Sequence, residues 1–256
     1  MFSAYTIGRL MGKRIVASIA LCLMGVLLLT GCVAPHFRWA PRTTSSTTGG
    51  AKPTAQQLIA SLQKNFRSVS AFHVAMQVDN PGPVAQGQVQ IRSADGDVLM
   101  PDKVKALASV ILSGQAVQVN LISVGSSQFI TDPVTGQWRV VKGVLDPRTL
   151  TNPDTGLISL INKVQNISQP VSDNVNGTAC WRITGQLDAK YIAFFTGGGV
   201  PAGTMLHTSA CIGQNDALPY QVIITGQAAA GDTPQTTRTF VLSKYNESIS
   251  INAPQI

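Results

Sequence analysis

The sequence predicts an α+β fold in which one long antiparallel sheet carries a few short helices. Apolar and polar residues alternate with a period of two along much of the chain, as they do in half-buried strands. The 256 residues include 23 glycines and 14 prolines, which supply turns between such strands. Of all residues, 44% are hydrophobic and only 12% are charged. This composition supports a large core and excludes a disordered chain, a coiled coil or a helical solenoid.

The N-terminus carries the pattern of a secretory signal. Arg9, Lys13 and Arg14 precede an uncharged apolar run that closes on Leu29-Thr30-Gly31-Cys32. A basic region, an apolar region of ~15 residues and small residues at the exit are typical of a cleaved signal peptide. The closing four residues resemble the lipobox of bacterial lipoproteins, so residues 1–31 are predicted to be a lipoprotein signal peptide.

Cys32 is then expected to be the first mature residue and to carry a diacylglyceryl group, with palmitate as a typical acyl chain. Each buried methylene contributes ~0.8 kcal/mol, so two chains anchor a protein stably where one does not. This predicts a location on the extracytoplasmic face of a bacterial cell membrane. An uncleaved membrane helix over residues 15–34 stays open, because ~20 apolar residues can span a bilayer. Met1 and Met11 are equally acceptable starts.

Residues 32–52 are predicted to be the lipidated cysteine and a flexible tether rich in proline, threonine, serine and glycine. Twenty such residues span roughly 25 Å on average. Because no internal repeat or second linker follows, residues 53–256 are predicted to form a single domain.

This domain opens with a helix and continues with strands. After Pro53 and Thr54, apolar residues at Leu58, Leu62 and Phe66 recur with helical spacing. Strict alternation from residue 72 to 79 then indicates a strand. Further strands are expected over residues 84–93, 104–113, 116–124, 128–131, 137–141, 171–175, 179–187, 204–212, 218–227, 236–244 and 248–251, with a hairpin turn at Asn176-Gly177. Helical stretches are expected after residue 156 and over residues 188–195. We therefore expect about ten antiparallel strands and three short helices.

Periodicity leaves two architectures open for so long a sheet. It can enclose an ordinary filled core, or curl into a partial barrel whose concave side holds a cavity. The same valines, leucines and isoleucines would line a cavity or pack against one another, and physical grounds alone favour the filled core.

Three blocks of sequence resemble a known family. They are Gly125–Pro133 with Thr135–Trp138, Asp146–Leu157, and Val241–Glu247. Together with the lipobox, the tether and the first helix in matching order, they are similar to the mycobacterial LppX/LprA/LprF/LprG lipoproteins, which share a fold with the LolA and LolB lipoprotein carriers. The resemblance implies a half-barrel of antiparallel strands, with short helices on its concave face enclosing an apolar cavity for acyl chains.

The implied role is to bind lipids or lipoglycans and carry them across the extracytoplasmic space, without catalysis or a cofactor. The alternative is a sensor or protein-interaction module of the same fold with a closed cavity. Expected partners are acylated lipids or lipoglycans, the membrane through the anchor, and a membrane transporter as lipid donor, with the protein itself a monomer. The residues expected to line the lipid cavity, each of which could equally be plain core, are Val117, Val119, Leu121, Leu157, Leu160, Ile161, Val164, Ile192, Phe194 and Phe195.

Cys180 and Cys211 are expected to form a structural disulfide, since the chain is predicted to be secreted and they form no CxxC motif. Closing a loop of about 30 residues gives ~3–4 kcal/mol of stability. We expect the bond to fasten the helix around residues 191–195 to the sheet. The pair is not part of the family pattern.

Charge and motifs argue against other function classes. The net charge of +7 includes the three basic residues of the signal. Without them the chain has 16 basic and 12 acidic residues, and so small an excess of positive charge argues against a nucleic-acid partner. No HExxH, CxxC or Walker motif predicts a metal or nucleotide site. A cell-wall hydrolase would need His73 or His207 with a carboxylate, but His73 lies on the polar side of its strand. Carboxylates such as Asp132 and Asp188 are explained as caps of turns and helices.

Overall fold

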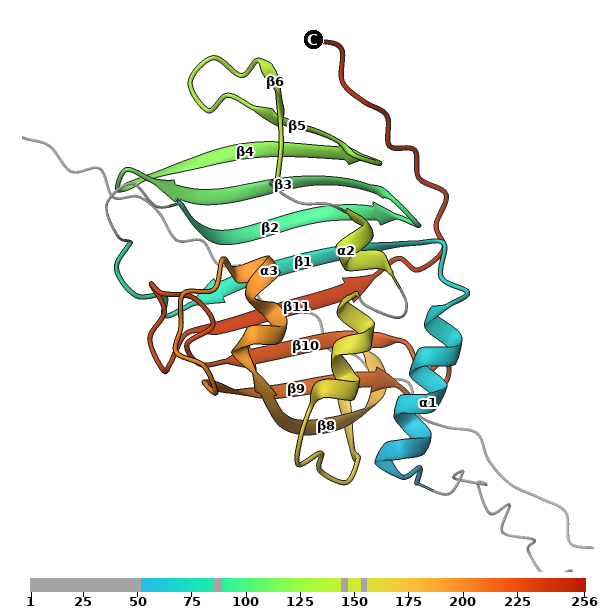
Figure 1. Cartoon of the computed structure of the whole chain (residues 1–256). Coiled ribbons are helices and arrows are strands. Elements are labelled where there is room, and N and C mark those ends of the chain that lie inside the picture. Colours follow the sequence, from blue (N-terminus) through green and yellow to red (C-terminus); the bar gives the residue numbers. More distant parts are fainter. Residues whose placement is uncertain (1–51, 85–88, 144–146, 153–155) are drawn as a thin grey trace, which may run out of the picture. The chain divides into compact units, whose positions relative to one another are not determined.

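Eleven antiparallel strands lie side by side in one open sheet in the computed structural model, which describes residues 52–84, 89–143, 147–152 and 156–256. Their order is β6-β5-β4-β3-β2-β1-β11-β10-β9-β8-β7 (Figure 1). The strands are β1 (Ala71–Asp79), β2 (Val89–Leu99), β3 (Lys103–Leu112), β4 (Gln115–Val124), β5 (Ser127–Thr131), β6 (Trp138–Val141), β7 (Val171–Val175), β8 (Thr178–Asp188), β9 (Met205–Gly213), β10 (Pro219–Thr225) and β11 (Thr237–Ser243). The sheet therefore consists of two meanders that are joined where the last strand pairs with the first.

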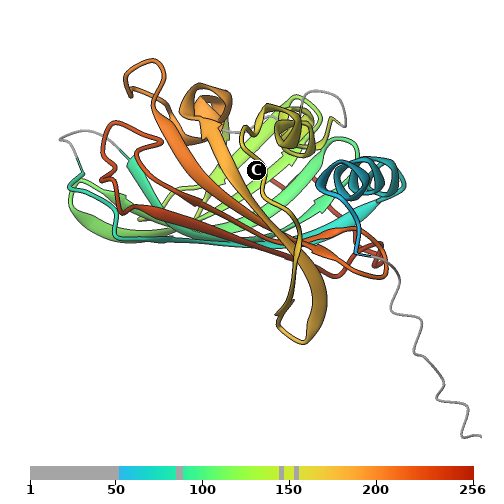
Figure 2. The same cartoon turned by 90° about the horizontal axis from the view of Figure 1, so that it is seen from below.

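The short helices all lie on the concave face of this sheet (Figure 2). They are α1 (Ala55–Phe66), α2 (Pro147–Thr151), the 3₁₀ helices η1 (Leu157–Lys163) and η2 (Ala189–Ile192), and α3 (Ala193–Thr196). The predicted half-barrel is thus confirmed, with eleven strands where about ten were expected. The predicted signal peptide, Cys32 and all of the tether except Lys52 lie outside the described residues. No helix in the described ranges is long and apolar enough to cross a bilayer.

Local sequence determines where α1 begins. The Thr54 hydroxyl accepts a hydrogen bond from the backbone N–H of Gln57 at 3.2 Å, and the Gln57 side chain accepts one from the N–H of Thr54 at 2.9 Å. This capping box satisfies two backbone donors that a helix start otherwise leaves free. Leu58, Leu62 and Phe66 then fall on one buried side of the helix. Their spacing turns that side toward the sheet.

The core fills the space between the helices and the part of the sheet that extends from β8 to β3. Leu58 and Leu62 pack against Ile183 of β8 and Ile212 of β9. A second cluster joins η2 to the sheet and contains Leu187, Ala189, Ile192, Leu206, Ile224 and Ala228. A third, next to Phe66, contains Val69, Phe72, Val98, Val104, Leu218 and Leu242. The helices are therefore held by apolar burial on one part of the sheet.

A buried ion pair fixes the loop between β10 and β11. Arg238 donates from Nη1 to Asp232 Oδ2 at 2.7 Å and from Nη2 to Oδ1 at 2.9 Å. Asp232 Oδ2 also accepts hydrogen bonds from the backbone N–H groups of Ala228 and Ala229. A bidentate pair with further donors offsets the cost of burying both charges. The loop is consequently tied to β11.

The hairpin predicted at Asn176-Gly177 is confirmed. Both residues have positive φ, 50° and 86° respectively, which is the conformation of a two-residue type I′ turn. β7 and β8 pair directly on either side of it.

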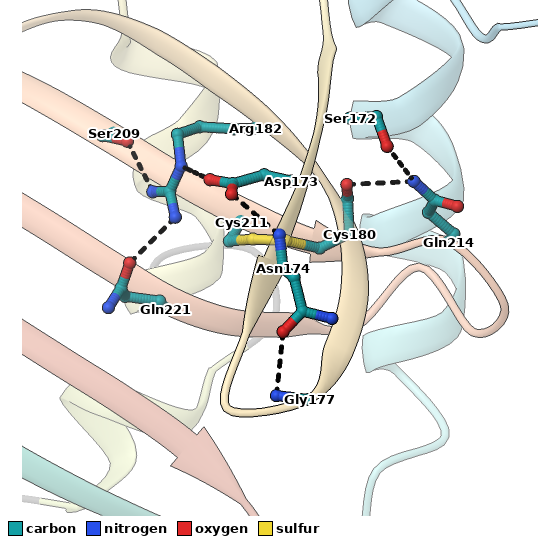
Figure 3. Close-up of a disulfide and its surroundings, with 10 residues drawn as sticks. All are labelled: Ser172, Asp173, Asn174, Gly177, Cys180, Arg182, Ser209, Cys211, Gln214 and Gln221. Carbon is teal, nitrogen blue, oxygen red and sulfur yellow. Dashed lines mark hydrogen bonds and ion pairs between the residues drawn. A yellow bond between two sulfur atoms is a disulfide. The ribbon is translucent and has the colours of Figure 1, made fainter.

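The predicted disulfide joins Cys180 of β8 to Cys211 of β9, and both residues are fully buried (Figure 3). The expectation that it fastens a helix to the sheet is wrong. Cys180 lies near the beginning of β8, whereas η2 follows the end of that strand at Asp188. Beside the disulfide, Arg182 pairs with Asp173, and this hydrogen bond lowers the pKa of that carboxyl (Figure 3).

Two strand predictions also need correction. β2 continues to Leu99, beyond the expected end at residue 93, because Asp95 and Asp97 face the convex side although they interrupt the apolar pattern. Residues 248–251 form no strand. Both edges of β11 are already paired with β1 and β10, so Ile251 instead packs on Ile122 and Phe129.

Replacing both Cys180 and Cys211 with alanine should lower the free energy of unfolding by ~3–4 kcal/mol, because the cross-link closes a long loop in the unfolded chain. Urea denaturation followed by circular dichroism under non-oxidising and oxidising conditions measures this. The reduced parent protein is the control and should match the variant. An unchanged urea midpoint in the variant would contradict a stabilising role.

Stability should also fall at high pH because of two packed tyrosines. Tyr220 donates to Asp216 Oδ2 at 2.6 Å, and burial followed by this contact raises the pKa of Tyr220 to about 12. Burial also raises the pKa of Tyr245, whose hydroxyl donates to the carbonyl of Pro219. The folded state favours the neutral phenols, so stability should be intact below pH ~10, the ordinary tyrosine pKa, and decline above it. Denaturation midpoints at pH 9 and pH 11.5 should differ less in Tyr220→Phe than in the parent, and an equal decline would contradict this assignment.

Candidate functional site

The helices leave part of the concave face without cover. Figure 1 shows α3 and η1 in front of the strands around β10 and β11, while β3 and β4 have no helix in front of them. The side chains that β2, β3, β4 and β5 direct to this face follow from the strand register. They form what we call the concave apolar surface: Val89, Ile91, Ala94, Gly96, Ala106, Ala108, Val110, Leu112, Val117, Val119, Leu121 and Ile130.

Water reaches much of this surface. Val89 is 58% exposed, and Ile91 and Leu112 are each 38% exposed. These three side chains lie in adjacent rows of β2 and β3, so they form a contiguous exposed apolar area, which makes this surface a candidate binding region.

One row of paired residues shows that this surface continues under the helices. The row crosses eight strands and every residue in it is apolar. From β8 to β4 it consists of Ile183, Ala210, Val222, Phe240, Met76, Ala94, Ala108 and Val119. The helix-covered core and the open surface are therefore one apolar layer.

Small residues occupy the middle of the open part. Ala94 pairs with Ala108, and in the next row Gly96 pairs with Ala106. We call these four residues the small-residue strip. Larger side chains flank it, with Met76 on β1 and Val119 on β4. A slender apolar ligand could lie over the strip and contact the larger side chains on both sides.

The predicted cavity residues fall into two groups. Val117, Val119 and Leu121 lie on the concave apolar surface, where they pair with Val110, Ala108 and Ala106 and are half-buried.

The other predicted cavity residues lie among the helices. Leu160 of η1 and Val164, which follows that helix, pack against the cluster that contains Ile192, which is only 2% exposed. Ile161 packs against the cluster that contains Leu58 and Leu62 of α1. The ring of Phe195 packs against that of Phe240 in the apolar row, with the centroids 5.6 Å apart and the ring planes tilted by 52°. The remaining two are Phe194, which is 48% exposed, and Leu157, which begins η1 and whose side chain lies outside the described set. That these helix residues line a lipid cavity stays a prediction.

Sequence reasoning did not single out the small-residue strip. The alternation Val104, Ala106, Ala108 and Val110 predicts a strand, but alanine and glycine give little signal for a binding surface. Only the pairing of β2 with β3 places the four small residues together.

The two carboxylates that the sequence predicts as caps, Asp132 and Asp188, serve local structure. The Asp132 side chain accepts hydrogen bonds from the backbone N–H groups of Val134 and Thr135, and Asp188 accepts one from Lys190. That backbone hydrogen bond, with the Lys190 side chain, lowers the pKa of Asp188. Within the described ranges, no group of three His, Cys, Asp or Glu residues is placed to hold a metal ion.

The family follows from a sequence comparison. Residues 54–251 match the profile of the LppX_LprAFG lipoproteins. The chain belongs to this lipoprotein family. Curated relatives include the lipoarabinomannan carrier protein LprG of Mycobacterium tuberculosis and of Mycobacterium bovis, each 20% identical over 252 residues, which is 95% of this chain and 96% of the relative.

Solved structures show the same fold. LprF from Mycobacterium bovis superposes with a TM-score of 0.62 at 20% identity, covering 78% of this chain and 96% of LprF. LppX from Mycobacterium tuberculosis gives a TM-score of 0.55 at 18% identity, covering 77% of this chain and all of LppX. The half-barrel is therefore a shared architecture of the family.

A phenylalanine at Ala108 should occupy the space over the small-residue strip and weaken binding of a fluorescent long-chain fatty acid such as cis-parinaric acid at least tenfold. Loss of a few buried methylene contacts at ~0.8 kcal/mol each accounts for that factor. The matched control is Ser109→Phe, which adds the same ring to the convex face of the same strand. Fluorescence titration of both variants, with thermal unfolding to verify folding, tests this. Equal affinities would contradict a binding role for the strip.

Proposed function

We propose that this protein is a membrane-anchored lipoprotein that binds the acyl chains of lipids or lipoglycans on its concave face and carries them across the extracytoplasmic space. The observation that carries the proposal is the apolar row across eight strands, left open over the small-residue strip. Membership in a family whose curated relatives are named lipoarabinomannan carriers supports it.

The energetics of transport suit such a surface. At ~0.8 kcal/mol per methylene, moving a 16-carbon chain from water into an apolar site gains roughly 13 kcal/mol. A carrier must supply comparable apolar contact and then release it at a membrane. Catalytic groups are not needed for that task, and the half-buried Val119 and Leu121 provide apolar contact beside the strip.

We further propose that residues 1–31 are removed, that Cys32 carries the anchor and that residues 32–52 tether the domain. A tether of this length holds the domain roughly 25 Å from the headgroups on average, near enough to exchange lipid with the bilayer. A membrane transporter is the proposed donor of the lipid, and the domain acts as a monomer.

The deciding experiment is solvent extraction of full-length protein purified from a bacterial membrane, followed by mass spectrometry of the extract. Non-covalent acylated lipid should be recovered from the parent and largely lost from Ala108→Phe, while Ser109→Phe retains it. The acyl chains on Cys32 are covalent and should remain with the protein.

The variant Cys32→Ala separates anchor from cargo. It should leave the membrane fraction and still contain extractable lipid. Full membrane retention with an unprocessed mass would instead indicate an uncleaved helix. If no variant contains lipid and none transfers fluorescent lipid between vesicles, the sensor or interaction module with a closed interior replaces the carrier.

A further inference from the structure

We propose a second ligand site, for one sugar unit, on the convex face of the sheet. A pocket of about 210 Å³ lies there over β2, β3 and β4, opposite the concave apolar surface. We call it the convex pocket. Its polar lining consists of Asp95, Asp97, Lys105 and Asn120, and its apolar lining includes Leu107 and Trp138.

Strand register places these side chains on one face. Asp97 pairs with Lys105, while Asp95 pairs with Leu107, which in turn pairs with Asn120. The two rows are neighbours on the convex side. Trp138 reaches the pocket from β6.

A glycine explains why the pocket can form there. A Cβ atom on Gly96 would lie 2.5 Å from the carbonyl oxygen of Lys105 and 2.7 Å from the Cβ of Ala106. The two strands therefore approach closely only because residue 96 has no side chain. A larger residue at position 96 would push β2 and β3 apart beneath the pocket.

The two carboxylates are held in place by one histidine. His73 Nδ1 lies 2.8 Å from Asp97 Oδ1, and Nε2 lies 3.2 Å from Asp95 Oδ2. The His73 side chain is 17% exposed, whereas those of Asp97 and Asp95 are 39% and 66% exposed. The imidazole thus engages one oxygen of each carboxylate. The acids remain accessible to a ligand at the rim of the pocket.

The indole ring of Trp138, which lines the convex pocket, is held in place by packing. Trp138 packs against the cluster of Ile122, Phe129 and Ile251. Ile251 belongs to the C-terminal segment, so this segment helps to fix the indole. A ring fixed in this way can stack on a ligand without a large loss of side-chain entropy.

This combination of groups matches a neutral sugar. Sugar hydroxyls both donate and accept hydrogen bonds, and one face of the ring presents C–H groups. Asp95 and Asp97 accept, Lys105 donates, and Asn120 does both. Trp138 and Leu107 offer an apolar surface for the C–H face. An anion would be repelled by the two carboxylates, and a hydrocarbon chain would desolvate the rim charges without compensation.

The site is independent of acyl-chain binding because it lies on the other face of the sheet. A lipid whose polar part is a glycan could engage both faces, but the sugar site itself is testable with soluble glycosides. Its failure would leave the proposed carrier function untouched.

The test uses full-length protein labelled with 5-fluorotryptophan and ¹⁹F NMR. The chain has three tryptophans, Trp39, Trp138 and Trp181, and the signal of Trp138 is assigned from Trp138→Phe. Methyl glycosides of mannose, glucose, galactose and arabinose are titrated separately. At least one should shift the Trp138 signal and leave Trp181 unchanged, with a dissociation constant on the order of 1 mM, as expected for so small a ligand.

Variants then test the polar groups. Asp95→Ala should weaken that glycoside at least tenfold, and it should fold because Asp95 is largely exposed. The control Thr184→Ala, on the convex face of β8, should bind normally, and cis-parinaric acid should bind all of these proteins equally. The proposal is overturned if no glycoside shifts Trp138, if Asp95→Ala binds the sugar unchanged, or if Nα-acetyl-lysine methyl ester binds more tightly than every glycoside, which would indicate a docking point for a protein's basic side chain.

Discussion

The pairing of β1 with β11 is the contact on which the rest of the structure depends. It joins strands that are far apart in sequence, with His73 opposite Ser243 and Asp79 opposite Thr237. Without it the chain would hold two separate meanders, each with a second unpaired edge strand besides β6 or β7. With it, the apolar residues of both halves form one continuous layer. The first helix and the last strands then meet in a shared cluster around Phe72 and Leu242.

The same sheet presents two different chemistries because strand side chains alternate. Toward the helices it presents valine, alanine and phenylalanine across eight strands. On its back it presents hydroxyl, carboxylate and amide groups, including the network of Arg182 with Ser209 and Gln221 (Figure 3). Helices cover one part of the apolar face only. The uncovered part is where binding can occur without first displacing a packed element.

Much of the fold could be predicted from local signals. The capping residues Thr54 and Gln57, the turn at Asn176-Gly177 and the alternation through Val117, Val119 and Leu121 each indicate one element without knowledge of its neighbours. Strand partners carry the information that was missing. Ala94 and Ala108 become a site only through their pairing, and the disulfide's distance from the η2 helix depends on where along β8 its cysteine lies. Asp95 and Asp97 hide the second half of β2 from sequence analysis, because they interrupt the apolar pattern. Their partner, His73, lies on β1 and is not apparent from the local sequence of β2.

If the concave face binds acyl chains as proposed, the exposure of Val89, Ile91 and Leu112 affects how the domain meets a bilayer surface. Apolar area left in water costs roughly 25 cal/mol per Å², so the empty protein is the more adhesive form. In that case an acyl chain that covers these side chains lowers the attraction of the domain to the bilayer surface, and its release restores that attraction. A loaded domain on the proposed tether would then stand away from the bilayer more readily than an empty one.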